Sequence, residues 1–181
     1  RKGFRNSKGI LMKKIVVYSS KTGNTKKIGE AIADELGCKA VSFDVAKDID
    51  FNMYDFIAVG FYVDKGAPEI NFKKFMQERI KDKNVGLFIT LGSDDDGDHA
   101  KQILNVGREL LIANNNKILR EFVCQGAISD EVLEQMRKLG EMMPNDPRFA
   151  LTPERLARWE RGKSHPDDND VENAKLAFSN L

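Results

Sequence analysis

The stretch KIVVYSSKTGNT, residues 14–25, decides the fold of this 181-residue chain. Ile15–Val17 is an unbroken β-branched run, which is typical of a strand buried on both faces. Small and polar residues follow, and the apolar positions then take the i, i+4, i+8 spacing of an amphipathic helix, at Ile28, Ile32 and Leu36. A strand, a hydroxyl-rich turn and a helix start together predict an anion site, because free backbone N–H groups and the positive helix end face the turn.

Composition narrows the class of protein. Hydrophobic residues make up 41% of the chain, enough for one domain with a sizeable core. The 29 basic and 28 acidic residues give a net charge of +1, which does not favour nucleic acid or a membrane surface as partner. No apolar run approaches the ~18 residues of a membrane-spanning helix. The two cysteines, Cys38 and Cys124, form no C-x-x-C motif, and no signal peptide is visible, so we expect a cytoplasmic protein.

The first eleven residues are basic and carry no apolar core, and Met12 directly precedes the first predicted strand. We expect residues 1–11 to be a cloning remnant or an unstructured leader, and residues 12–181 to form the domain.

Further strands and helices alternate along the chain. Strands are predicted at residues 40–45, 56–61, 85–91 and 118–124, and helices at about 69–80 and 99–113. This alternation predicts an α/β fold with a doubly wound parallel sheet of five strands and helices on both faces. Ligands of such folds bind outside the carboxyl ends of the strands. The loops that matter therefore follow the first, third and fourth strands, at Ser19–Thr25, Phe61–Pro68 and Gly92–Asp98.

A helical excursion over residues 127–166 is predicted before the terminal helix. Ser129 caps its first helix, and Thr152-Pro153 opens a second one with an N-cap and a proline at the first helical position. Asp167–Asp170 then forms an acidic cap for the last helix.

Two segments resemble the flavodoxin family. Val16–Thr25 matches the family's apolar strand with an aromatic end, followed by S/T-x-T-G-x-T and a helix, although Gly29 stands where the family usually has alanine. Tyr54–Gly60 is similar to the strand that leads to the first flavin-ring loop. The likeness covers roughly Met12–Gly126, with the terminal helix matched loosely. It implies a flavodoxin-like sheet of order 2-1-3-4-5 with FMN at the switch point.

The resemblance also implies the residues that hold FMN. Its phosphate would be bound by Ser20, Lys21, Thr22, Gly23, Asn24 and Thr25. In the second loop the ring would be flanked by Phe61 or Tyr62 and Val63, with Lys65 and Gly66 presenting backbone groups near the redox-active nitrogen. In the third loop the contacts would come from Gly92, Ser93 and Asp94. The family often places a tyrosine in this loop; this chain has none there, and His99 is the nearest substitute.

The acidic run Asp94–Asp96 admits two further interpretations. An EF-hand register would put Gly92 and Ile103 at the first and last ligand positions, so we expect no metal. Neighbouring carboxylates disfavour the anionic reduced flavin, so we expect a low-potential cofactor.

Three functions follow from the resemblance. The first is an FMN electron carrier between a reductase and an acceptor protein, with no catalytic side chain of its own. The second is an FMN-dependent NAD(P)H oxidoreductase of a small organic substrate or quinone. The third is an interaction module without flavin. A homodimer formed through the helical excursion remains open in each case.

Overall fold

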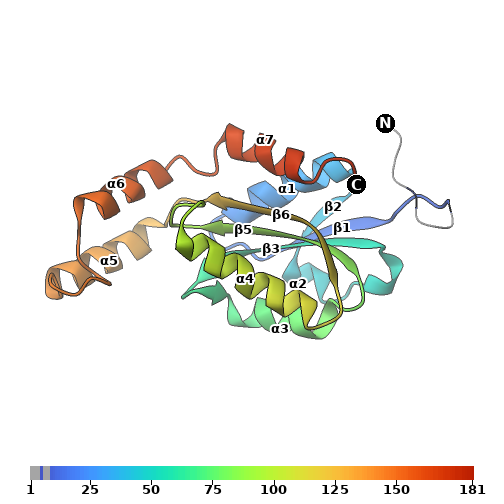
Figure 1. The fold of residues 1–181 in the computed structure, drawn as a ribbon, viewed down its shortest axis with the longest axis horizontal. Coiled ribbons are helices and arrows are strands. Elements are labelled where there is room, and N and C mark those ends of the chain that lie inside the picture. The colour runs from blue at the N-terminus through green and yellow to red at the C-terminus, as the bar shows by residue number, and fades with distance from the viewer. Residues whose placement is uncertain (1–4, 6–8) are drawn as a thin grey trace.

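The computed structural model describes residues 5 and 9–181 and shows a parallel sheet with helices on both faces (Figure 1). The sheet contains β1 (Lys14–Tyr18), β2 (Lys39–Ser42), β3 (Phe56–Asp64), β5 (Asn84–Leu91) and β6 (Lys117–Gln125). Their order is β2-β1-β3-β5-β6, and every neighbouring pair is parallel. The predicted doubly wound, five-stranded order is therefore confirmed.

Helices divide between the two faces of the sheet. One face packs against α1 (Asn24–Leu36) and α7 (Asp168–Ala177), and the other against α2 (Phe43–Ala46), α3 (Ile70–Arg79) and α4 (Asp98–Ile112). A single 3-10 turn, Phe51–Met53, precedes β3. The central strands alternate between the two cores: Val17 and Val59 belong to one hydrophobic cluster, and Val16 and Ala58 belong to the other.

Two strand predictions need correction. The strand expected at residues 40–45 ends at Ser42, because the chain turns into α2 and places the Phe43 ring 5.4 Å from that of Phe72. The strand expected to end at Phe61 continues to Asp64 and pairs in antiparallel fashion with a short sixth strand, β4 (Ala67–Pro68). The turn between them takes positive φ angles at Lys65 and Gly66.

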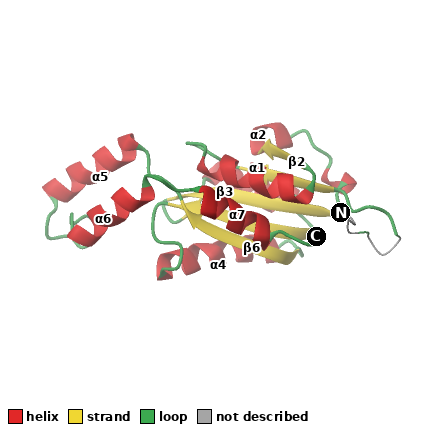
Figure 2. Ribbon diagram, turned by 90° about the horizontal axis from the view of Figure 1, so that it is seen from above, coloured by secondary structure: helices red, strands yellow, loops and turns green. Residues whose placement is uncertain are grey.

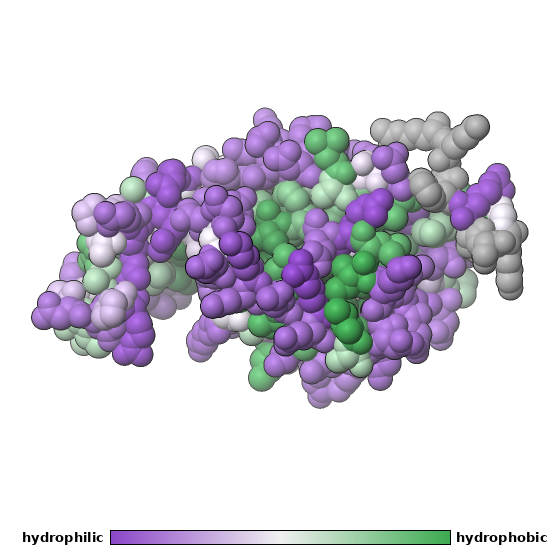
Figure 3. All heavy atoms as spheres, in the orientation of Figure 1, coloured by the Kyte–Doolittle hydropathy of each residue, from purple (hydrophilic) through white to green (hydrophobic). Residues whose placement is uncertain are grey.

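The helical excursion forms α5 (Asp130–Met142) and α6 (Pro153–Gly162). Figure 2 shows the two helices side by side, standing out from the body of the domain beyond the carboxyl ends of the strands. Hydrophilic residues dominate the visible face of this hairpin, whereas hydrophobic ones gather over the body (Figure 3). Its helices begin at the predicted caps: Ser129 Oγ accepts from the N–H of Val132, and Thr152 Oγ1 accepts from that of Arg155.

The predicted leader falls largely on residues 1–4 and 6–8, which lie outside the described part of the chain. Of the described residues, Arg5 and Leu11 form an isolated antiparallel bridge. Among the described helices, none is long and apolar enough to cross a membrane.

Candidate functional site

The turn between β1 and α1 is built to receive an anion. Gly23, the N-cap of α1, has a φ of 96°, and the first turn of the helix has neither a side-chain cap nor an acidic residue. The N–H of Gly23 donates to Ser20 Oγ over 3.1 Å, which closes the turn on itself. Lys21 and Thr22 are exposed at its tip. The positive helix end and its free N–H groups therefore face solvent, where a phosphate would be favoured.

Two side chains of this turn hold the loop in place. Thr25 is 1% exposed, and its hydroxyl lies 2.8 Å from the hydroxyl of Thr90 on β5. Asn24 Nδ2 donates to the carbonyl of Ala127 over 2.9 Å. Thr25 thus ties the turn to β5, and Asn24 ties it to the segment that follows β6. The side chains of Asn24 and Thr25 are used in these contacts, whereas their backbone N–H groups, in the first turn of α1, are free to bind an anion.

The second loop offers one aromatic ring rather than two. Phe61 is fully buried, with its ring centroid 6.5 Å from that of Phe72, so the prediction that it could stack on a flavin is wrong. Side chains alternate along a strand, so Tyr62 points to the other face, the one that carries α1. Tyr62 is half-buried, and its pKa is raised by burial and by the carboxylates of Glu69 and Asp64, which keeps the phenol neutral.

The remaining residues of the second loop have different environments. Val63 is half-buried and packs against the core on the α3 side. Lys65 is exposed, whereas Gly66 is half-buried with a φ of 81°. The turn between β3 and β4 therefore exposes its backbone, rather than a packed side chain, at the carboxyl edge of the sheet.

The third loop contains an unpartnered polar atom. Ser93 Oγ is buried and has no hydrogen-bond partner among the described residues. A Cβ at Gly92 would lie 2.5 Å from Ile128 Cγ1, so the chain that follows β6 passes closely over this loop. Asp94 lies 3.4 Å from the guanidinium of Arg161 on α6. Buried polar groups are normally hydrogen-bonded, so a bound ligand would explain the unsatisfied Ser93 hydroxyl in this otherwise well-packed loop.

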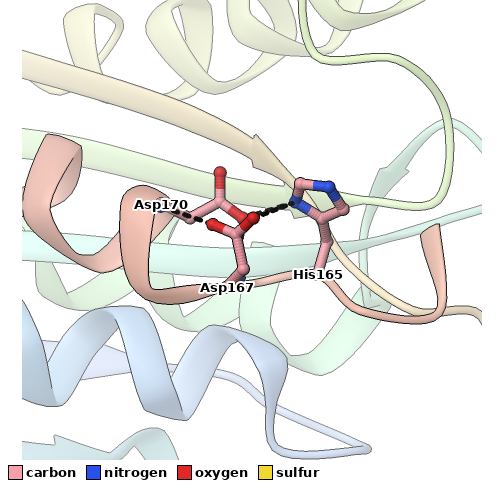
Figure 4. A group of neighbouring side chains, drawn as sticks. All are labelled: His165, Asp167 and Asp170. Atoms are coloured by element: carbon pink, nitrogen blue, oxygen red, sulfur yellow. Dashed lines mark hydrogen bonds and ion pairs between the residues drawn. The ribbon is translucent and has the colours of Figure 1, made fainter. Parts of the chain in front are cut away.

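Three side chains gather at the start of α7, where sequence reasoning predicted the acidic cap but missed the histidine that joins it (Figure 4). His165 Nδ1 lies 2.6 Å from Asp170 Oδ2. Asp170 Oδ2 also accepts from the N–H of Asp167, and Asp167 Oδ1 accepts from the N–H of Asp170. The Asp170 N–H also lowers the pKa of the Asp167 carboxyl. Three potential metal ligands lie within 4.8 Å, but these hydrogen bonds already account for the arrangement as a helix cap.

The acidic cap predicted over Asp167–Asp170 is confirmed, whereas the histidine contact depends on the path of the chain through Pro166. Lys27 Nζ donates to the Pro166 carbonyl over 2.6 Å and thereby ties this segment to α1. His99, the proposed substitute for a stacking aromatic residue, is exposed in the first turn of α4.

A sizeable hollow lies at the opposite end of the sheet. It has a volume of about 760 Å³ and is lined by residues at the start of β1 and the end of α1, among them Leu36 and Cys38. Open α/β sheets bind ligands at the carboxyl ends of their strands, so we place the site at the three loops instead.

The thiols of Cys38 and Cys124 are poor nucleophiles in this structure. Burial raises the pKa of Cys38 to about 11, and burial together with nearby aspartates raises that of Cys124 further. A raised pKa keeps each thiol protonated at neutral pH, and the thiolate is the reactive form.

The residues at the three loops fit FMN. The uncapped helix start after β1 suits its phosphate. Half-buried Tyr62 is on β3, one strand from β1, and the buried Ser93 hydroxyl follows β5, two strands from β1. A flavin ring attached to a phosphate at the turn would reach both positions. Neighbouring strands are about 4.8 Å apart, so the strand order sets this span.

Comparisons with known proteins identify the same family that the sequence resembles. The family model of the flavodoxin domain matches residues 15–179. A flavodoxin-like domain-containing protein BilS of Clostridioides difficile is 33% identical over 174 residues, which cover 94% of this chain and 96% of the relative. A flavodoxin of Haemophilus influenzae is 27% identical over 153 residues, which cover 78% of this chain and 88% of the relative.

Solved structures share the fold. Oxidised Flavodoxin 2 from Bacillus cereus aligns with a TM-score of 0.54 at 16% identity, over 92% of this chain and 97% of that one. A flavodoxin from the domain Archaea aligns with a TM-score of 0.52 at 23% identity, over 71% of this chain and 94% of that one. Since the family model spans nearly the whole chain and the sheet order and anion-binding turn agree with it, this protein belongs to the flavodoxin family of FMN-binding proteins.

Proposed function

We propose that this flavodoxin-like protein is an electron carrier that takes electrons from a reductase and passes them to an acceptor protein. The observation that carries the proposal is the uncapped start of α1, a phosphate site at the switch point of a sheet with the flavodoxin order. Bound FMN supplies the redox chemistry, and the protein supplies binding and electrostatics. The two free cysteines are compatible with a reducing compartment such as the cytoplasm.

Each loop has its own part in this function. The free backbone N–H groups in the first turn of α1, after Gly23, hold the phosphate, which fixes one end of the cofactor. Tyr62 and the turn at Lys65-Gly66 flank the ring at the end of β3. The third loop contributes Ser93 and the carboxylates of Asp94–Asp96, of which Asp94 is already paired with Arg161.

An NAD(P)H oxidoreductase is the second candidate, because the α5–α6 hairpin stands at the edge where a substrate would meet the flavin. Anaerobic stopped-flow mixing with NADPH and NADH separates the two. For a carrier we expect direct reduction to be slow and to become fast only when a flavodoxin reductase is added. Rapid reduction by a nicotinamide alone would replace the carrier with the oxidoreductase. A colourless protein that gains no absorption near 450 nm with added FMN would overturn both.

The acidic loop should lower the potential of the bound flavin. Asp95 and Asp96 are exposed and have no cation within ion-pair distance among the described residues, so their charges disfavour an anionic reduced cofactor. We expect the Asp95→Asn/Asp96→Asn double variant to have a higher midpoint potential, with the difference shrinking as salt is added. Asp48→Asn, which removes an exposed carboxylate from the segment between α2 and β3, serves as the control. Equal midpoints for the double variant and the control would contradict this role.

A further inference from the structure

The hairpin helix α6 lies against the third loop of the flavin site. Arg161 reaches Asp94 over 3.4 Å, and Gln125 Nε2, at the end of β6, donates to the carbonyl of Arg158 over 3.4 Å. A Cβ on Gly162 would lie 2.9 Å from the same Gln125 nitrogen, so the backbone of α6 meets the sheet edge closely there. Trp159 is buried at 4% exposure beneath Arg137 of α5. The base of the hairpin is therefore a fixed part of the domain.

Arg158 shares the loop-facing side of this helix. It precedes Arg161 by three residues, and side chains at that spacing lie on one face of a helix. Its Nε is buried, and the guanidinium has neither a hydrogen bond nor an ion pair among the described residues. Burying a charged donor without an acceptor is costly, so an acceptor is expected to complete this position.

A second buried atom without a partner lies in the third loop, which α6 contacts through Arg161. Ser93 Oγ immediately precedes Asp94, the residue to which Arg161 is paired. Leu91 of β5 pairs with Gln125 of β6, so the segments that carry Ser93 and Arg158 start from neighbouring strand ends. The two unsatisfied polar atoms thus lie on segments that the Arg161–Asp94 contact joins at the carboxyl edge.

We propose that Arg158 and Ser93 form a subsite for the pyrimidine edge of the flavin ring. This edge presents carbonyl oxygens and a nitrogen that becomes negatively charged on reduction, so a guanidinium matches it in both redox states and more strongly in the reduced one. The phosphate is excluded as the occupant, because its turn follows β1 and Ser93 follows β5, roughly 10 Å away at two strand spacings. This inference rests on the proposed function.

The assignment makes the hairpin part of the cofactor site. The positive charge of Arg158 acts on the reduced flavin with the sign opposite to that of the acidic loop. It favours the reduced cofactor, whereas Asp95 and Asp96 disfavour it. The sequence of the excursion therefore tunes the flavin as well as covering the edge of the sheet.

The test compares flavin binding to the full-length apoprotein and three variants. Arg158→Met keeps the length of the side chain and its packing but removes the guanidinium. Ser93→Ala removes only the hydroxyl. Arg161→Gln is the matched control, because it removes one positive charge from the same face of the same helix, where the side chain is 60% exposed and already paired. Each protein is titrated with FMN and with riboflavin, which has the same ring but no phosphate, and the midpoint potential of each FMN complex is measured.

We expect Arg158→Met to weaken FMN and riboflavin by the same factor, about tenfold or more, since a charge-assisted hydrogen bond is lost. Its affinity for reduced FMN should fall more than that for oxidised FMN, which lowers the midpoint potential. Ser93→Ala should weaken both flavins by a smaller common factor, and Arg161→Gln by less than either. Thermal unfolding of the apoproteins checks that each variant is folded.

Four results would overturn the inference. A loss confined to FMN would place Arg158 on the phosphate. Unchanged binding of both flavins by Arg158→Met and Ser93→Ala would make the corner structural, while leaving the FMN proposal in place. Failure of the unmodified protein to bind either flavin would remove both proposals together. An equal loss with Arg161→Gln would instead show a general effect of charge.

Discussion

Replacing Gly60 with alanine is expected to lower the free energy of unfolding by about 3 kcal/mol, because the added methyl group has no room. A Cβ at this position would lie 2.0 Å from Cε2 and 2.1 Å from Cζ of Phe88. That ring is fully buried and meets the Phe178 ring edge-on at 6.4 Å. Gly60 also pairs with Tyr18 of β1 and with Phe88 of β5, so its backbone is held from both sides.

Urea unfolding of a double-mutant cycle measures this effect. Phe88→Leu is costly by itself, but it removes the ring atoms that the new methyl would strike. The Gly60→Ala/Phe88→Leu double variant should therefore lose less stability than the sum of the single variants. Gly97→Ala is the control, since its backbone is extended and the nearest atom to a new Cβ, Asp94 O, is 3.5 Å away. Strict additivity of the two changes would contradict the clash.

Placing a carboxylate in the phosphate turn should weaken FMN binding by about 100-fold or more. Thr22 is exposed at the tip of the turn, so Thr22→Asp leaves the core intact while it sets a negative charge beside the phosphate. Like charges brought together cost several kcal/mol, and each 1.4 kcal/mol is a factor of ten in the dissociation constant.

Thr22→Asn provides the comparison, because asparagine has nearly the shape of aspartate but no charge. We expect its FMN affinity to stay close to that of the unmodified protein, as measured by quenching of flavin fluorescence. Riboflavin, which lacks the phosphate, should bind all three proteins alike. If aspartate and asparagine reduced FMN affinity equally, the electrostatic account of this turn would be wrong.

The correct predictions from the sequence rest on short-range physics. The strand at Ile15–Val17 and the helix that ends at Leu36 follow from consecutive or periodic apolar residues, and both are confirmed. The caps at Ser129 and Thr152 are also confirmed, because each side chain bonds a backbone N–H only three residues away. The alternation of strands and helices predicted a doubly wound parallel sheet, and the resemblance to flavodoxins implied its strand order; both are confirmed.

The errors arise where a contact joins distant parts of the chain. Phe61 and Tyr62 are equally aromatic in sequence, but the register of β3 sends the first into the core beside Phe72 and the second to the α1 face. The expected strand at residues 40–45 was cut short because Phe43 packs on α3, a helix that begins 27 residues later. Neither outcome is encoded in local propensity.

By itself, the sequence determined the phosphate turn, the alternation of strands and helices, and the flavin that the family binds, because all of these depend on patterns within a few residues. Only the tertiary structure decided that Phe61 is buried in the core while Tyr62 is on the opposite face, and that α6 returns to the third loop, where Arg161 meets Asp94. Arg161 and Asp94 are 67 residues apart and meet only after the sheet has set the positions of β5 and β6. Such a contact depends on packing of the whole domain, which no local pattern specifies.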